Sequence, residues 1–389
     1  MAWNEPIDLA SIAAQIDVHR ALPHVDFKDH ARKRQIHWGG DLAKRHAIYL
    51  DLKFWIGMRE ADGSSNAGVY GALLEALRRA VSAGWAFCPI SDGCFLEVFK
   101  QSDPATRRRT VELIDELSLG ATLIHFDQRV GTEIAHLLHS GVTPERMVPL
   151  DVLVWTKLSN VLGYYTPPVE MFDVSTGRAV EKAFFDFMWN LPLAEMDKFI
   201  GDGMASHDTD RHSRLAVELT QGIQANAARI RSFDQAYEHE LVGVVDLFTD
   251  LAAQVIIDMA PGSLGPRPQR GTAQYKDIER QCLALLVGAM KTERGRATLR
   301  TLHIHVSLHA AVRWNKGQKF KANDFFDYQH AAAAVGYCDS FFTERSLASV
   351  LTRKDLALDK LYGCHVASTP EAAIEHVLAI QPVRASASK

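Results

Sequence analysis

Carboxylates gather in one stretch near the end of the sequence, residues 323–345. Asp324 and Asp327 stand in what reads as the first turn of a helix, where the helix dipole favours negative charge. Because they are three residues apart, they share one face of that helix. Asp339 and Glu344 flank a short apolar, aromatic segment that is typical of a buried strand. Charges among apolar residues need a partner, and several carboxylates can share a bound cation.

Two more acids follow apolar segments earlier in the chain. Asp51 comes directly after residues 46–50, a pattern that indicates a buried parallel strand, and ligands in such sheets bind at the carboxyl ends of strands. Glu97 lies among aromatic and aliphatic residues in a helix that follows a second short strand within 85–90. The alternative interpretation is that Asp51 opens a turn and that Glu97 marks the boundary between two faces of its helix.

A basic segment precedes the acidic stretch. Residues 291–321 contain eight basic residues and one acid, although the whole chain carries a net charge of −4. Within it, residues 313–321 place an aromatic side chain on each side of Gly317. Basic groups can hold phosphates while aromatic rings stack on unpaired bases, and the alternative is a solvent-exposed loop. The candidate nucleic-acid-binding residues are Arg313, Trp314, Lys316, Lys319 and Lys321.

The composition is that of an ordinary globular protein. The chain has 389 residues, of which 47% are hydrophobic and 23% charged, enough for two or three domain-sized units. An odd number of cysteines without dense spacing indicates a reducing compartment, so we expect a cytoplasmic location. The most apolar segment, 241–260, is interrupted by three aspartates, so we expect no membrane span.

Strand and helix patterns alternate in the first third of the chain and again at its end. This alternation predicts an α/β fold with a mostly parallel sheet, and the long helical segment between predicts a large all-helical insertion. Within residues 1–40 we expect a helix followed by an irregular basic segment. The predicted segments are an N-terminal extension (1–40), a first core part (41–125), the helical insertion (126–299), a second core part (300–380) and a polar tail (381–389).

This layout resembles the PIN-domain nucleases, a branch of the flap-endonuclease-like group, over residues 40–125 and 300–380. The resemblance rests on Tyr49-Leu50-Asp51, on residues 91–97, on the helix around Asp327, and on the strand between Asp339 and Glu344. It implies a three-layer PIN-like core. It also implies catalytic, metal-binding roles for Asp51, Glu97, Asp327 and Asp339. Supporting roles would fall to Asp324, His330, Thr343 and Glu344.

Glu344 stands where this family usually has an aspartate, so we expect it to act through water or a second metal ion. Phosphodiester cleavage passes through a highly charged transition state, in which divalent ions activate the attacking water and neutralise the leaving oxygen. Carboxylates suit Mg²⁺ or Mn²⁺, and acids gathered in one pocket repel each other unless a cation is present. We therefore expect Mg²⁺ or Mn²⁺ as the cofactor.

The expected function is a metal-dependent nuclease, with RNA favoured by the resemblance. One alternative is a single-stranded or flap DNA nuclease of the same fold. Another is a catalytically inactive PIN-like binding or assembly protein, with a homo-oligomer or protein partner bound through the helical insertion. A zinc site at His303, His305 and His309 is a weaker alternative, because His303 lies off the face that the other two share and no cysteine is near.

Overall fold

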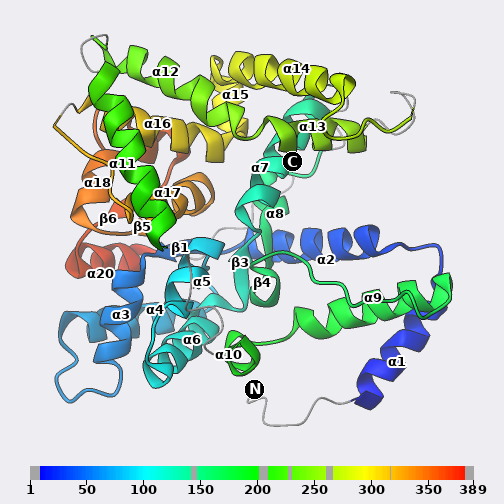
Figure 1. The fold of residues 1–389 in the computed structure, drawn as a ribbon. Coiled ribbons are helices and arrows are strands. Elements are labelled where there is room, and N and C mark those ends of the chain that lie inside the picture. Colours follow the sequence, from blue (N-terminus) through cyan, green and yellow to red (C-terminus); the bar gives the residue numbers. More distant parts are fainter. Residues whose placement is uncertain are drawn as a thin grey trace, which may run out of the picture. The chain divides into compact units, whose positions relative to one another are not determined.

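A computed structural model describes residues 9–141, 147–200, 209–226, 230–259, 266–315 and 317–381 (Figure 1). Lys316 and residues 382–389 of the expected polar tail lie outside the described residues. The chain forms two compact units. Unit 1 comprises Met1–His125, Asp151–Ser206 and Pro370–Lys389, and unit 2 comprises Phe126–Leu150 and His207–Thr369.

Unit 1 combines short strands with helices. Its strands are β1 (His46–Leu50), β2 (Ala86–Phe87), β3 (Ala121–Leu123) and β4 (Trp155–Lys157). Its helices are α1 (Leu9–Arg20), α2 (Phe27–Leu42), α3 (Leu52–Ala61), α4 (Gly68–Ser82), α5 (Asp92–Phe99), α6 (Pro104–Ser118), η2 (Leu158–Asn160), α9 (Val174–Trp189), α10 (Leu193–Ile200) and α20 (Pro370–Ala379). The short helix α8 (Leu150–Leu153) begins at the boundary with unit 2.

The strands of unit 1 bring several carboxyl ends to one edge. β1 and β2 are parallel, with His46 opposite Ala86, and Ile90 forms a parallel bridge with Thr122 of β3. β3 and β4 are antiparallel. Because neighbouring parallel strands end at the same edge, the residues after β1, after Ile90 and after β3 lie on one side. Helices α3, α4 and α6 pack against one another beside these strands, and α20 packs against α4.

A buried carboxylate joins three helices of unit 1. Asp186 of α9 has its Oδ2 2.9 Å from His19 Nε2 of α1, and its Oδ1 2.8 Å from His30 Nε2 of α2. Arg34 of α2 also donates to Asp186 Oδ1 through Nε and Nη2. The basic segment that we expected to be irregular is part of helix α2. Its Arg34 pairs with Asp186, a buried partner 152 residues away that the sequence alone does not reveal.

Unit 2 is mostly helical. Its helices are α7 (Phe126–Ser140), α11 (Thr209–Asn226), α12 (Phe233–Asp246), α13 (Thr249–Met259), α14 (Ala273–Met290), α15 (Glu293–Thr298), α16 (Arg300–Trp314), α17 (Asp324–Tyr337), α18 (Arg345–Leu351) and α19 (Leu358–Tyr362). Its strands are β5 (Ser340–Phe342) and β6 (His365–Ala367). The two strands are parallel, with Phe341 opposite Val366.

Helix α16 lies at the centre of unit 2. It packs against α7, α12, α15, α17 and α18, and Figure 1 draws it among the green and orange helices. Most of its side chains are buried, including polar ones. One of these, Thr301, donates its backbone N–H (2.9 Å) and its hydroxyl (2.7 Å) to the fully buried Glu133 of α7. Tyr337 of α17 also donates to Glu133, so this carboxylate connects three helices.

The mixed α/β class predicted from the sequence is confirmed, with parallel pairing in each unit. The segment boundaries differ from expectation. Residues 151–206, expected in the helical insertion, belong to unit 1 and include strand β4. The expected second core part does not stand apart from the preceding helices, since residues 207–369 form one unit. None of the helices in the described ranges is both long and apolar enough to cross a membrane.

Two residues of types that often cap helices stand at N-cap positions without a capping side-chain hydrogen bond. Asn323 has a helical backbone conformation and makes no side-chain cap, and α17 continues one residue past Gly336. Ser91 precedes α5 but its Oγ lies 2.6 Å from the Tyr49 hydroxyl and does not cap. By contrast, Asp103 caps α6 as its position before Pro104 predicts, accepting from Thr106 N at 2.8 Å.

Asp186→Asn should lower the free energy of unfolding by about 3 kcal/mol at pH 7, because it leaves the partly exposed Arg34 guanidinium and the two imidazoles without the buried carboxylate that they share. Burial alone would raise the pKa of Asp186, but His30 and Arg34 outweigh it and hold the value at about 2. In the wild-type protein this stabilisation should be complete above about pH 4 and disappear as the pH falls towards 2, since an unfolded aspartate titrates near 3.9.

The measurement is urea unfolding at several pH values. The matched control is Asp41→Asn, which breaks the exposed Asp41–Lys44 pair and should change stability by less than about 1 kcal/mol. Equal effects of the two substitutions would contradict the central role of Asp186.

Candidate functional site

The first group of candidate residues lies at the strand edge of unit 1. Asp51 follows β1, precedes α3 without capping it, and is 8% exposed. Asp92, 4% exposed, opens α5, and His125 follows β3 with its Nε2 3.7 Å from Asp92 Oδ2. Glu97 is partly buried on α5. These side chains place several carboxylates and an imidazole after neighbouring strands.

The structure brings Asp51 and Glu97 into the surroundings of one thiol. Burial raises the pKa of Cys94, and the negative charges of Glu97 and Asp51 raise it further. The thiol is thereby kept protonated, so it is no nucleophile. The charges of both predicted acids reach Cys94, which lies in α5.

Asp92 and His125 were not singled out from the sequence. The signal that could have found them is the one that selected Asp51, since each comes shortly after a short apolar segment. Once β2 is known to pair with β1, and Ile90 to bridge to Thr122 of β3, the residues that follow fall on the edge where Asp51 lies.

The second group lines a pocket of about 620 Å³ in unit 2. Three carboxylates come from the first turn of α17 and from the residue before α18, and two lysines come from the segment before α17. These residues are Asp324, Asp327, Glu344, Lys319 and Lys321. Asp324 Oδ2 accepts from Lys321 N at 2.9 Å, and burial raises the pKa of its carboxyl. The pocket thus offers oxygen ligands beside positive charge.

Asp339 lies apart from Asp327. Asp327 is in the first turn of α17, whereas Asp339 follows the last turn, and ten helical residues span about 15 Å. Asp339 is exposed at the start of β5, where its carbonyl accepts from His365 N, while Glu344 follows the other end of the strand. The expectation that Asp327 and Asp339 converge is therefore corrected: carboxylates so far apart cannot share one ion.

The predicted nucleic-acid-binding residues separate into two kinds. Lys319 and Lys321 are exposed at the pocket. Arg313 is buried and its Nε donates to Glu240 Oε1 of α12, so it is not available to phosphates. Trp314 packs against a small apolar cluster of Ile230, Ala236 and Ala310, which makes it a core contact. The composition of the segment indicates positive charge, but it does not show that the side chain of Arg313 faces inward.

The remaining predicted residues are buried. His330 is 1% exposed on α17, and Thr343 is fully buried, with its N–H donating to Ala367 O at 2.9 Å. Burial lowers the pKa values of His303 and His305 to about 3, which keeps both rings neutral. These side chains contribute to packing around α16 and α17.

A different histidine group has the spacing of metal ligands. His19, His30 and Asp186 bring their ligand atoms within 4.8 Å of one another, and in the described ranges no other such triad occurs. Arg34 already donates two hydrogen bonds to Asp186, so we interpret the group as an ion-pair network. The three acids of the unit 2 pocket do not form such a closely spaced group.

Comparison with known proteins adds no identification. No protein-family model, no curated protein and no solved structure matches the chain. The functional argument therefore rests on the residue pattern and on the geometry of the two groups.

Arg313→Met should lower the free energy of unfolding by about 3–5 kcal/mol, because it leaves the Glu240 carboxylate buried without its partner. Lys319→Met is the matched control, since it removes a positive charge from an exposed position and should change stability by less than about 0.5 kcal/mol. Urea unfolding of both variants at pH 7 measures the difference. If Arg313→Met is as stable as the control, the buried pair does not form.

Proposed function

We propose that this chain is a divalent-metal-dependent nuclease with a PIN-like core and with RNA as its favoured substrate. The observation that carries the proposal is the unit 2 pocket, where Asp324, Asp327 and Glu344 lie beside Lys319 and Lys321. A metal ion and a phosphate are the two partners that such a mixture of charges suits together.

The carboxylates supply the metal-binding half. Asp324 and Asp327 are three residues apart on one helix, so they offer their oxygens from the same face. Glu344 joins them from the start of α18, and its longer side chain suits contact through a bound water. Mg²⁺ or Mn²⁺ bound here would lower the pKa of a coordinated water and neutralise charge on the leaving oxygen.

The lysines supply the phosphate-binding half. Lys319 and Lys321 are exposed, and the latter lies within electrostatic reach of Asp324. Phosphate contacts position a nucleic acid without reading its bases, so this surface fits a substrate chosen by strand geometry. RNA, as the favoured polymer, follows from the PIN resemblance, and single-stranded or flap DNA is the competing substrate for the same pocket.

Asp51 and Glu97 keep their proposed catalytic role as the acids of unit 1. The negative charges of both raise the pKa of Cys94. Asp339 leaves the proposed ligand set, because it lies at the far end of α17 from Asp327. The proposed ligand set therefore includes Asp327 but not Asp339, although the sequence pattern had predicted both. An activity assay of the two single variants can distinguish their roles.

Asp327→Asn should abolish Mg²⁺-dependent cleavage of single-stranded RNA, because it removes a proposed metal-binding carboxylate while keeping the size of the side chain. Asp339→Asn is the matched control and should keep most of the activity. Asp51→Asn tests the acids of unit 1 in the same assay. The measurement is cleavage of end-labelled RNA and of single-stranded and flap DNA, with and without EDTA, alongside urea unfolding of each variant. Cleavage that continues at full rate in excess EDTA would falsify the metal mechanism.

Replacing Lys319 and Lys321 together by alanine should flatten the dependence of log affinity on log salt by about 1.4, since each phosphate contact on a single strand contributes about 0.7. The control replaces Lys354 and Lys360, two exposed lysines of unit 2 that do not line the pocket. Binding is measured by filter titration at several salt concentrations, in an Asp327→Asn background that blocks cleavage. An identical slope in both double variants would exclude the pocket lysines as phosphate contacts.

A further inference from the structure

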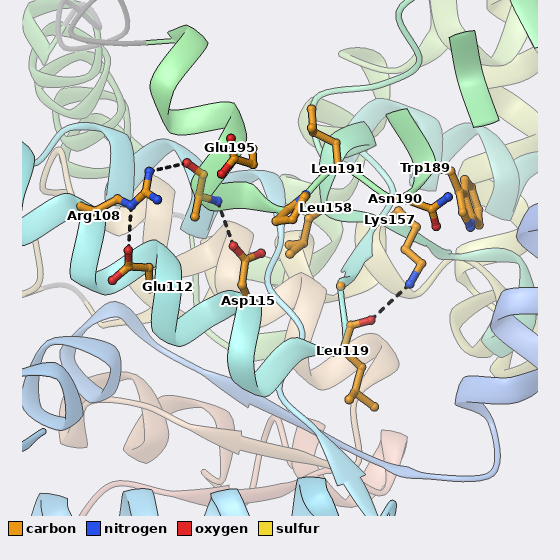
Figure 2. Close-up of a pocket in the computed structure, with 13 residues that line it drawn as sticks. Arg108, Glu112, Asp115, Leu119, Lys157, Leu158, Trp189, Asn190, Leu191 and Glu195 are labelled. Carbon is orange, nitrogen blue, oxygen red and sulfur yellow. Dashed lines mark hydrogen bonds and ion pairs between the residues drawn. The ribbon is translucent and has the colours of Figure 1, made fainter. Parts of the chain in front are cut away.

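Unit 1 contains a second pocket, of about 540 Å³, that the proposed nuclease function does not use (Figure 2). It lies between α6, the end of β4 and the connection from α9 to α10. Its lining combines Trp189, Leu158 and Leu191 with charged side chains. Such a cavity is of a size that holds a small molecule.

Lys157 is the unusual group in this lining. Its Nζ donates to Leu119 O at 3.2 Å and lies 3.4 Å from the centre of the Trp38 ring. Among the residues that the structure describes, no carboxylate forms an ion pair with it. An ammonium removed from water without a counter-ion is disfavoured relative to the neutral amine.

Burial raises the share of that neutral form, although the face of the Trp38 ring attracts the ammonium. Burial, together with the positive charge of Arg34, lowers the pKa of the ammonium to about 8. At pH 7 about a tenth of the side chain is then the free amine, which is a nucleophile, whereas an ordinary lysine is almost wholly protonated.

The other end of the pocket is acidic. Figure 2 draws Glu112, Asp115 and Glu195 away from Lys157. Asp115 is engaged by the backbone N–H groups of Leu193 and Ala194, at 2.8 Å each. Glu112 and Glu195 each hold one basic partner and keep further lone pairs that can accept from a ligand.

These charges select the ligand. Glu112 and Glu195 already hold basic partners, so that end of the lining carries little unpaired charge and a neutral polar molecule fits it. A carbonyl group suits the amine, and hydroxyl groups suit the carboxylates at the other end. A short hydroxyaldehyde carries both groups, and its carbon atoms can contact the Trp189 ring that also lines the pocket.

We propose that Lys157 binds small neutral hydroxyaldehydes in this pocket as a Schiff base. The amine lone pair forms a bond to the aldehyde carbon, while the carbonyl oxygen takes up a proton from the nitrogen to give a carbinolamine. Loss of one water molecule then leaves the imine. The step consumes an amine and an aldehyde and releases water, so it needs no oxidant or reductant.

The test is reductive trapping in the full-length protein. The protein is incubated with glyceraldehyde and cyanoborohydride, and the labelled peptides are mapped by mass spectrometry. Lys157 should be labelled at least about 10-fold faster than Lys44, an exposed lysine paired with Asp41, because its free-amine fraction at neutral pH is larger. The rate at Lys157 should rise with pH and level off above about 8. Lys157→Arg should remove this label while keeping the charge.

A second comparison isolates recognition of the hydroxyl groups. Glu195→Gln should slow labelling of Lys157 by glyceraldehyde several-fold and leave labelling by formaldehyde unchanged, since formaldehyde has no hydroxyl to bind. This measurement does not depend on the folding of the Lys157 variant. The proposal is overturned if Lys157 reacts no faster than Lys44, or if Glu195→Gln affects both aldehydes equally.

Discussion

The direction of α17 relative to the strand that follows it decides which acids can act together. The helix carries Asp324 and Asp327 in its first turn, and the chain leaves its last turn directly into β5. Asp339, the residue before β5, is therefore a helix length away from the first turn, whereas Glu344, the second residue after β5, lines the same pocket as the first turn. This constraint places Glu344 with the aspartates of α17, excludes Asp339, and defines the site on which the proposed function depends.

The parts of the fold that could be predicted depend on neighbours in the sequence. Strand β1 is a continuous apolar segment because it is buried, and the start of α6 follows from an aspartate and a proline side by side. Asp51 was placed after a strand for the same local reason. The α/β class followed from such segments, but the division into units did not, because residues 151–206 join unit 1 through contacts that no local pattern records.

Within the candidate site, the acids of α17 and the two exposed lysines could be predicted, and the inward-facing charges could not. Arg313 looked like its basic neighbours, yet Glu240 lies 73 residues earlier in the chain. His19 and Asp186 are 167 residues apart, so their pairing is equally invisible in the sequence. Glu133, whose pKa burial raises to about 7, is a third example of a charge assigned by tertiary packing. Charge composition identifies a basic segment, but burial decides what each side chain contacts.

The discontinuity of unit 1 has a consequence for its biosynthesis. Helix α20, which packs against α4, begins at Pro370, and the whole of unit 2 is translated before it. On the ribosome, α4 must therefore wait for α20 until the whole of unit 2 has been made. Until then the surface of α4 that α20 covers is exposed to solvent, and transiently exposed surface of this kind makes folding intermediates prone to aggregation.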